Sequence, residues 1–137
     1  MALESGISLE RGFDVTREIT AAALAERDNP GGAALPEVWS TPDMIGKMEI
    51  VAAALVEARL EPGQMTVGFR NEVSHLAATP VGARVRVQAT LAAVDGRKLT
   101  FAVVAFDEKE KVGEGTHVRF IVDQAKFAAR LKEKAGQ

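Results

Sequence analysis

The sequence contains no cysteine. This excludes a disulfide framework, a thiolate nucleophile and a cysteine-based metal site, and it is compatible with a reducing cytoplasm. Histidine is nearly as scarce, because His75 and His117 are the only two in 137 residues. Acid–base chemistry near neutral pH therefore has two imidazole candidates. Neither histidine has carboxylates at ligand spacing, so we expect no metal site.

Long apolar runs and an excess of positive charge are also missing. No segment approaches about 18 consecutive apolar residues, the length that a membrane-spanning helix needs. Residues 1–13 show no basic region followed by an apolar run, so we identify no signal peptide. The net charge is −2, without a basic cluster, which argues against nucleic-acid binding. We therefore expect a soluble cytoplasmic protein with one domain over residues 1–137.

The strongest helical signal is STPDMIGKMEIVAAALVEARL, residues 40–60. Thr41 is the expected N-cap, Pro42 suits the first helical position and Asp43 favours the first-turn dipole. Apolar residues recur at helical spacing over a wide band, so the helix should be covered on most sides. The band comprises Met44, Met48, Val51 and Leu55, with the neighbouring Ile45, Ala52 and Val56.

The rest of the chain predicts strands around this helix. Residues 7–18 alternate weakly and predict a first strand, whereas residues 26–39, rich in proline and glycine, predict a long loop that acts as a lid or binding loop. An Asp-Gly pair at 95–96 is a hairpin signal. A short amphipathic helix is expected at 123–134. The strands predicted after the long helix are 66–79, 84–94, 98–107 and 112–122.

The simplest packing of these elements is an α+β hotdog fold. In this fold a curved antiparallel sheet wraps around one long central helix. The wrapped sheet keeps an open edge, and such edges usually pair with a second copy. We therefore expect a homodimer.

Glu49 is the one polar residue in the apolar stretch 48–56. A lone carboxylate there costs stability unless a partner satisfies it, and an arginine or a backbone amide would do so without any function. His75 offers a functional partner. Pairing Glu49 with His75 would solve two desolvation problems and fix the imidazole tautomer. Strict strand alternation places His75 on the core face with Val67, Phe69, Val73 and Ala77.

Other candidates each have a structural explanation beside the functional one. Thr41 lies at a helix start, where an oxyanion would settle, although capping alone explains it. Gly68 interrupts a strand interior, which indicates either a bulge or close approach of a ligand. In GEGTHVR, residues 113–119, two glycines share a strand face with His117 and Arg119. That face either leaves room for an anionic ligand, which Arg119 would contact more readily than His117, or is an exposed face at a dimer edge.

Three ordered motifs resemble the fluoroacetyl-CoA thioesterase and its relatives in the hotdog superfamily. They are the Thr-x7-Glu spacing into the helix, the run H-x-A-A-T-P-x-G and the run G-x-G-T-H-x-R, within roughly residues 13–134. The resemblance implies an acyl-CoA thioesterase whose catalytic set matches Thr41, Glu49 and His75. It implies that Gly68 and Arg119 contact the substrate. It also implies a dimer with sites near the subunit interface, no metal, and no cofactor beyond the coenzyme A of the substrate.

One departure concerns the lid. The fluoroacetyl-specific enzyme carries aromatic residues before the PEV segment, where this chain has Ala34 and Leu35. We expect hydrolysis of a short or small acyl-CoA, with the acyl group left open. The nucleophile is also open between Thr41, Glu49 and a water. The alternative is a non-catalytic acyl-CoA or small-molecule binding protein on the same fold. A hydratase is disfavoured, because no histidine follows Asp43 closely.

Overall fold

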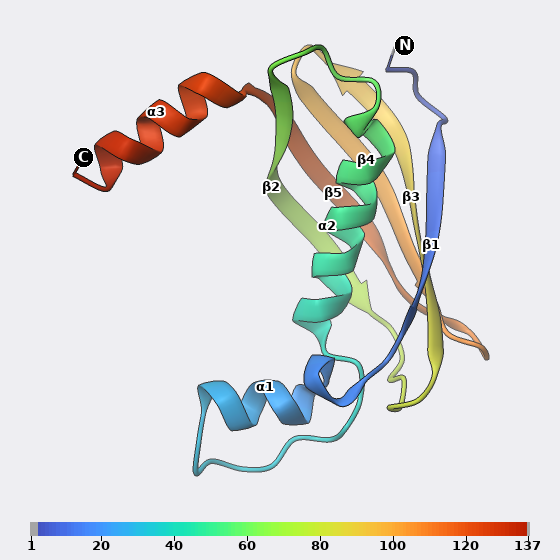
Figure 1. Cartoon of the computed structure of the whole chain (residues 1–137). Coiled ribbons are helices and arrows are strands. Elements are labelled where there is room, and N and C mark those ends of the chain that lie inside the picture. The colour runs from blue at the N-terminus through green and yellow to red at the C-terminus, as the bar shows by residue number, and fades with distance from the viewer. Residues whose placement is uncertain (1–2, 137) are drawn as a thin grey trace.

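The computed structural model describes residues 3–136. One antiparallel sheet of five strands, in the order β1-β3-β4-β5-β2, curves around a helix (Figure 1). The Asp95-Gly96 hairpin is confirmed, since Asp95 pairs with Lys98 and Gly96 has a φ of 61°. The strands are β1 Ser8–Asp14, β2 Gln64–His75, β3 Arg84–Asp95, β4 Lys98–Phe106 and β5 Lys111–Asp123.

Helix α2, Thr41–Glu57, lies across the concave face and contacts every strand of the sheet. Its core-facing side matches the predicted stripe, because Met44, Met48, Val51 and Leu55 are buried. The α+β class and the packing of sheet on helix are therefore found. The helix is not long, however, at 17 residues, and it is one of three α-helices in the described chain.

The segment before α2 differs from the prediction. The first strand ends at Asp14, a 3-10 turn follows at Arg17–Ile19, and residues Ala21–Asp28 form helix α1. Thr20 caps α1, since its Oγ1 accepts a hydrogen bond from the amide of Ala23 at 3.2 Å. The predicted loop is correspondingly shorter. A threonine before an alanine-rich run is a helix-start signal, and the nearby glycines and prolines obscured it.

The start of α2 also corrects the prediction. Ser40, not Thr41, is the N-cap, and its Oγ accepts a hydrogen bond from the amide of Asp43 at 3.2 Å. Thr41 is the first helical residue, and Pro42 follows it. Because Ser40 supplies the cap, the hydroxyl of Thr41 is left for other chemistry.

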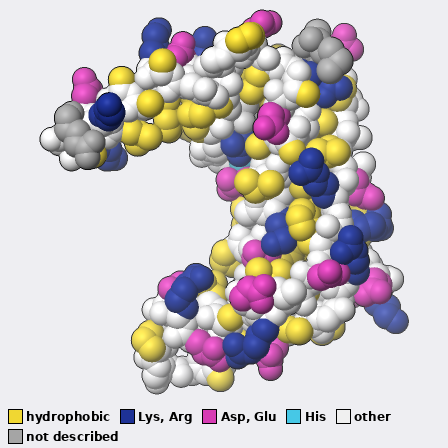
Figure 2. Space-filling view, viewed as in Figure 1, with side chains coloured by type: hydrophobic (Ala, Val, Ile, Leu, Met, Phe, Trp, Pro, Cys, Tyr) yellow, Lys and Arg dark blue, Asp and Glu magenta, His cyan; other side chains and the backbone are white. Residues whose placement is uncertain are grey.

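One side of α2 is not covered in this chain. Ile50 is 61% exposed and Gly46 is exposed one turn earlier, so the predicted coverage on most sides holds except along this side. Helix α3, Gln124–Lys134, extends away from the sheet beyond β2 (Figure 1). Apolar side chains line the side of α3 that borders a hollow between α3 and α1 (Figure 2). Among residues 3–136, no helix is both long and apolar enough to cross a membrane.

Candidate active site

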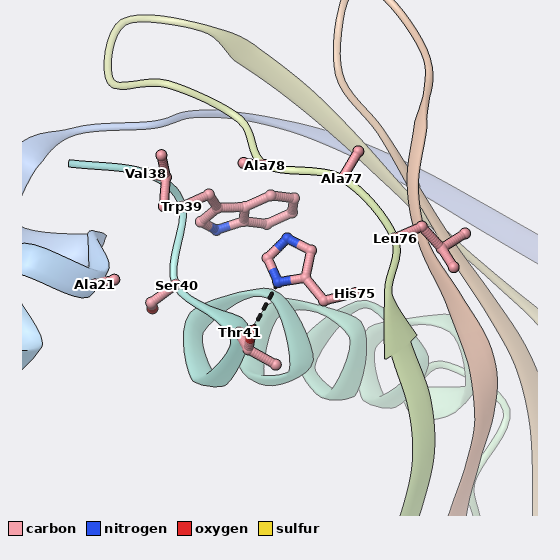
Figure 3. Close-up of a pocket in the computed structure, with 9 residues that line it drawn as sticks. All are labelled: Ala21, Val38, Trp39, Ser40, Thr41, His75, Leu76, Ala77 and Ala78. Carbon is pink, nitrogen blue, oxygen red and sulfur yellow. Dashed lines mark hydrogen bonds between the residues drawn. The ribbon is translucent and has the colours of Figure 1, made fainter. Parts of the chain in front are cut away.

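A hydroxyl and an imidazole meet where α2 begins and β2 ends. Thr41 Oγ1 lies 2.7 Å from His75 Nδ1, so the two groups share a hydrogen bond (Figure 3). Two features of the local structure allow this hydrogen bond. Ser40 takes the capping role, and β2 ends at His75, which places the imidazole over the first turn of the helix. The pair lines a cavity of about 360 Å³ with small and apolar neighbours that include Val38, Ala77 and Ala78.

His75 is half-buried against Trp39. The two rings are edge to face, with centroids 6.3 Å apart. Trp39 is held by its own indole N–H, which donates to Asp43 Oδ2 at 2.8 Å. Burial lowers the pKa of His75, so the imidazole is neutral at neutral pH and available as a base. Within the described chain, its Nε2 is buried and has no hydrogen-bond partner.

Glu49 lies two turns farther along α2 and has different partners. Its Oε2 accepts a hydrogen bond from Asn71 Nδ2 at 2.9 Å, and its Oε1 lies 3.9 Å from Arg119 Nη1. The side chain is 35% exposed, so it is not the fully buried carboxylate that the apolar sequence indicated. Glu49 lies eight positions after Thr41, about 12 Å along the helix axis. Within residues 3–136, no hydrogen bond joins Glu49 to His75.

A bulge in β2 brings Gly68 to the same face as His75. The pairing of β2 with β5 shifts register between Gly68 and Arg70, and Phe69 turns outward, where it is 67% exposed. The prediction that Phe69 faces the core is therefore wrong. A Cβ at Gly68 would lie 3.0 Å from Glu49 Oε1 and 3.4 Å from Arg119 Nη1. The bulge interpretation of Gly68 is confirmed, and the space beside its Cα is occupied by these two charged groups of the chain itself.

The face of β5 that carries His117 and Arg119 points under α2, not to an exposed edge. His117 is fully buried and Arg119 is 8% exposed. Arg119 donates from Nε to Thr66 Oγ1 at 2.9 Å and from Nη2 to Thr66 O at 3.1 Å. Burial lowers the pKa of Arg119, and the charge of Glu49 opposes that change. The dimer-edge interpretation of His117 is therefore wrong for this face.

The five predicted site residues thus form two groups within one chain. Thr41 and His75 form the first, and Glu49, Gly68 and Arg119 form the second. His75 lies seven positions beyond Gly68 in β2, which corresponds to about 23 Å of strand. Sequence reasoning missed the supporting side chains of Ser40, Trp39, Asn71 and Thr66, whose roles arise from contacts across the fold.

The first turn of α2 has fewer unpaired backbone N–H groups than most helix N-termini. Pro42 has no N–H, the amide of Asp43 donates to Ser40 Oγ and the amide of Met44 donates to Ser40 O. The amide of Thr41 is the remaining donor of the first helical residues. An oxyanion at this position would therefore rely on that amide and on the helix dipole.

Comparison with known proteins gives one family. The family model described as fluoroacetyl-CoA-specific thioesterase matches residues 15–125. The fluoroacetyl-CoA thioesterase of Streptantibioticus cattleyicolor is 39% identical over 107 residues, which cover 78% of this chain and 77% of that protein.

Solved structures agree with this match. The structure of the fluoroacetyl-CoA thioesterase FlK is 35% identical and superposes with a TM-score of 0.91, covering 98% of each chain. A hot-dog-like protein from Thermanaerovibrio acidaminovorans is 25% identical, with a TM-score of 0.83 over 95% of this chain and 91% of that one.

Proposed function

Because the chain belongs to the fluoroacetyl-CoA-specific thioesterase family, we propose that it hydrolyses the thioester of a short or small acyl-CoA. The observation that carries the proposal is the hydrogen bond of 2.7 Å between Thr41 Oγ1 and His75 Nδ1. A hydroxyl bonded to a neutral imidazole is the arrangement by which an alcohol is activated for attack on a carbonyl.

In the proposed reaction, His75 Nδ1 accepts the proton of Thr41 as Oγ1 attacks the thioester carbonyl. The coenzyme A thiolate leaves and takes a proton, and water then releases the acid from the threonine ester. The base role requires the tautomer that carries its proton on Nε2. Direct attack by water or by Glu49 is the competing route. Mass spectrometry of the rapidly quenched enzyme distinguishes the routes, since only attack by Thr41 forms an acyl ester on that residue.

A substrate panel tests the function itself. Short acyl-CoAs are incubated with wild type, His75→Ala and Thr41→Val, and the released thiol is measured. We expect activity in wild type on at least one member and a loss of about 100-fold or more in both variants. Thr116→Val is the matched control, because Thr116 is exposed on β5 away from the pair. Wild type and His75→Ala that are equally inactive on every member would refute the proposal and favour a binding protein.

We further propose a homodimer that joins the two groups of site residues. Strand β2 is the outermost strand on one side of the sheet, and an uncovered edge favours pairing with a second copy. Exposed apolar side chains surround this edge: Ile50 on α2, Phe69 on β2, Leu76 after β2 and Leu131 on α3. The hollow of Figure 2 lies on the same side.

The bulge of β2 supports one register for this pairing. Opposite residues of an antiparallel pair face the same side of the sheet. Gly68 and His75 are seven positions apart and would face opposite sides in a regular strand, but the bulge turns them to the same side. Pairing Gly68 with His75 of the partner subunit would place that imidazole beside Glu49, since opposite Cα atoms of an antiparallel pair lie about 5 Å apart.

Mixing two inactive variants tests the shared site. Glu49→Gln and His75→Ala homodimers are unfolded, combined in equal amounts and refolded together. If each site uses Glu49 of one subunit and His75 of the other, half of the dimers are mixed and each holds one intact site. Activity should return to about one quarter of wild type. No recovery, with light scattering showing a dimer, would place the whole site in one chain and refute the shared arrangement.

The remaining parts of the proposal concern the acyl group and the surroundings. Leu35 is 49% exposed at the position that the resemblance assigns to the aromatic lid. We propose that the cavity beside Trp39 accepts acyl groups without selecting for fluorine.

We also propose that hydroxyl, imidazole and carboxylate suffice without a metal or further cofactor, which unchanged activity after chelation would support. A cytoplasmic location is proposed on the absence of cysteine, and cell fractionation tests it.

A further inference from the structure

His117 is a fully buried histidine that the proposed catalytic set does not use. It sits in the middle of β5, with its ring stacked on Phe101, where the ring centroids are 6.1 Å apart and the planes differ by 28°. A buried imidazole costs free energy unless both ring nitrogens find partners. Both nitrogens of His117 have one, and these partners determine what the ring can do.

The two partners fix one neutral tautomer. Nδ1 lies 3.0 Å from the backbone carbonyl of Arg70, which can only accept, so Nδ1 carries the proton. Nε2 lies 3.2 Å from Nη1 of Arg119, which can only donate, so Nε2 is the acceptor. Burial is the main cause that lowers the pKa of His117, and the charge of Arg119 adds to it. The ring is therefore neutral and bonded at both ends.

The bond to Nε2 completes the support of the Arg119 guanidinium. Thr66 accepts hydrogen bonds from Nε and Nη2, and His117 accepts one from Nη1. Three bonds on different sides of a planar group fix its orientation. The remaining hydrogen of Nη1 is left for the space beside Gly68, where Glu49 Oε1 lies 3.9 Å away.

The bond to Nδ1 holds the backbone of the β2 bulge. Arg70 is the residue at which pairing with β5 resumes after Phe69 is skipped. His117 Nδ1 donates to the carbonyl of this residue, so one side chain contacts both the bulge and the guanidinium. The bulge directs Gly68 toward α2, and the guanidinium meets Glu49 at the same place.

We propose that His117 positions Arg119 toward Glu49 and Gly68, by accepting a hydrogen bond from the guanidinium while donating one to the bulged strand β2. Its importance for turnover rests on the proposed function and on the substrate contacts that the family resemblance implies for Gly68 and Arg119. His117 is a positioning residue, because it acts through Arg119 and does not itself reach the cavity beside Thr41.

Three substitutions separate the two hydrogen bonds. Glutamine reaches the position of Nε2 with an acceptor, asparagine reaches the position of Nδ1 with a donor, and phenylalanine keeps only the stacking on Phe101. We expect His117→Asn and His117→Phe to lose about 10- to 100-fold in kcat/KM, the scale of a small misplacement of a binding group. His117→Gln should stay within about threefold of wild type, because an acceptor for Arg119 is restored. Thermal unfolding of each variant separates this pattern from a general loss of stability.

Two further measurements decide the outcome. In an Arg119→Gln background, His117→Phe should cause no additional loss, since its effect passes through Arg119. The order parameter of the Arg119 Nε–H group, measured by NMR on labelled protein, should fall in the asparagine and phenylalanine variants and not in glutamine. An ordered guanidinium in all three variants, or additive losses in the double variant, would overturn the inference. The NMR result needs no turnover, so an enzyme inactive on every acyl-CoA would refute the function alone.

Discussion

Replacing Gly68 with alanine tests how closely β2 confines the carboxylate of Glu49. The new Cβ would lie 3.0 Å from Glu49 Oε1 and 3.4 Å from Arg119 Nη1. The first distance is too short for an ordinary contact, so Glu49 must retreat by a few tenths of an ångström. Because a displacement of about 1 Å costs about 100-fold in rate, this shift should lower kcat/KM by about 5- to 30-fold.

The free energy of unfolding of Gly68→Ala should not fall with its activity. Glycine in a strand interior costs about 0.5–1 kcal/mol relative to alanine. The atom that must move is the end of a flexible, 35% exposed side chain, so its displacement costs little. We expect the free energy of unfolding to stay equal or rise by up to about 1 kcal/mol. In Tm this is a rise of no more than about 5 °C for a chain of this size.

Thiol release from acyl-CoA and thermal unfolding together measure both effects. Gly113→Ala is the contrasting control, because its Cβ would lie 2.5 Å from Met44 Sδ inside the core. Overpacking there should lower stability by about 1–3 kcal/mol. If Gly68→Ala keeps kcat/KM within about twofold of wild type, close confinement of Glu49 has no role in the reaction. If its activity falls only together with its Tm, the loss reflects folding and the reasoning is refuted.

Three further predictions concern the helix start and the histidines. Thr41→Val should change the free energy of unfolding by less than about 0.5 kcal/mol while abolishing most activity, because Ser40 supplies the cap; a large loss in urea unfolding would contradict this. Ser40→Ala should lose about 1 kcal/mol in the same measurement, and an unchanged midpoint would show that the cap is dispensable. Burial lowers the pKa of His75 and of His117, so the unfolded chain binds more protons than the folded chain at mildly acidic pH. The free energy of unfolding should therefore keep its full value above the unfolded pKa of 6.5 and decrease as the pH falls below it. Urea unfolding across this range checks the sign, and His117→Phe should weaken the dependence.

The sequence determined the elements that depend on local pattern. The apolar stripe from Met44 to Leu55 and the Asp95-Gly96 hairpin follow from side-chain period and turn chemistry, and both are found. The period of the strand predicted at 84–94 is found from Val85 to Leu91, where a bulge in β3 ends it. The motifs around Thr41, Glu49 and His75 were sufficient to indicate the family. Helix α1 was missed, because a capped alanine-rich run lies beside a segment rich in glycine and proline.

Only the tertiary structure decided which of these residues meet. The capping of α2 by Ser40 leaves the Thr41 hydroxyl free, and only the fold brings His75 from the end of β2 to meet it. Strict alternation put Phe69 in the core, whereas the bulge turns it out and brings Gly68 beside Glu49. Contacts between elements far apart in sequence, such as Asn71 with Glu49, depend on strand register and helix placement. Periodicity reports which face of an element is buried and so limits strand register to alternate positions, but it does not say which side chains of a helix and a sheet meet.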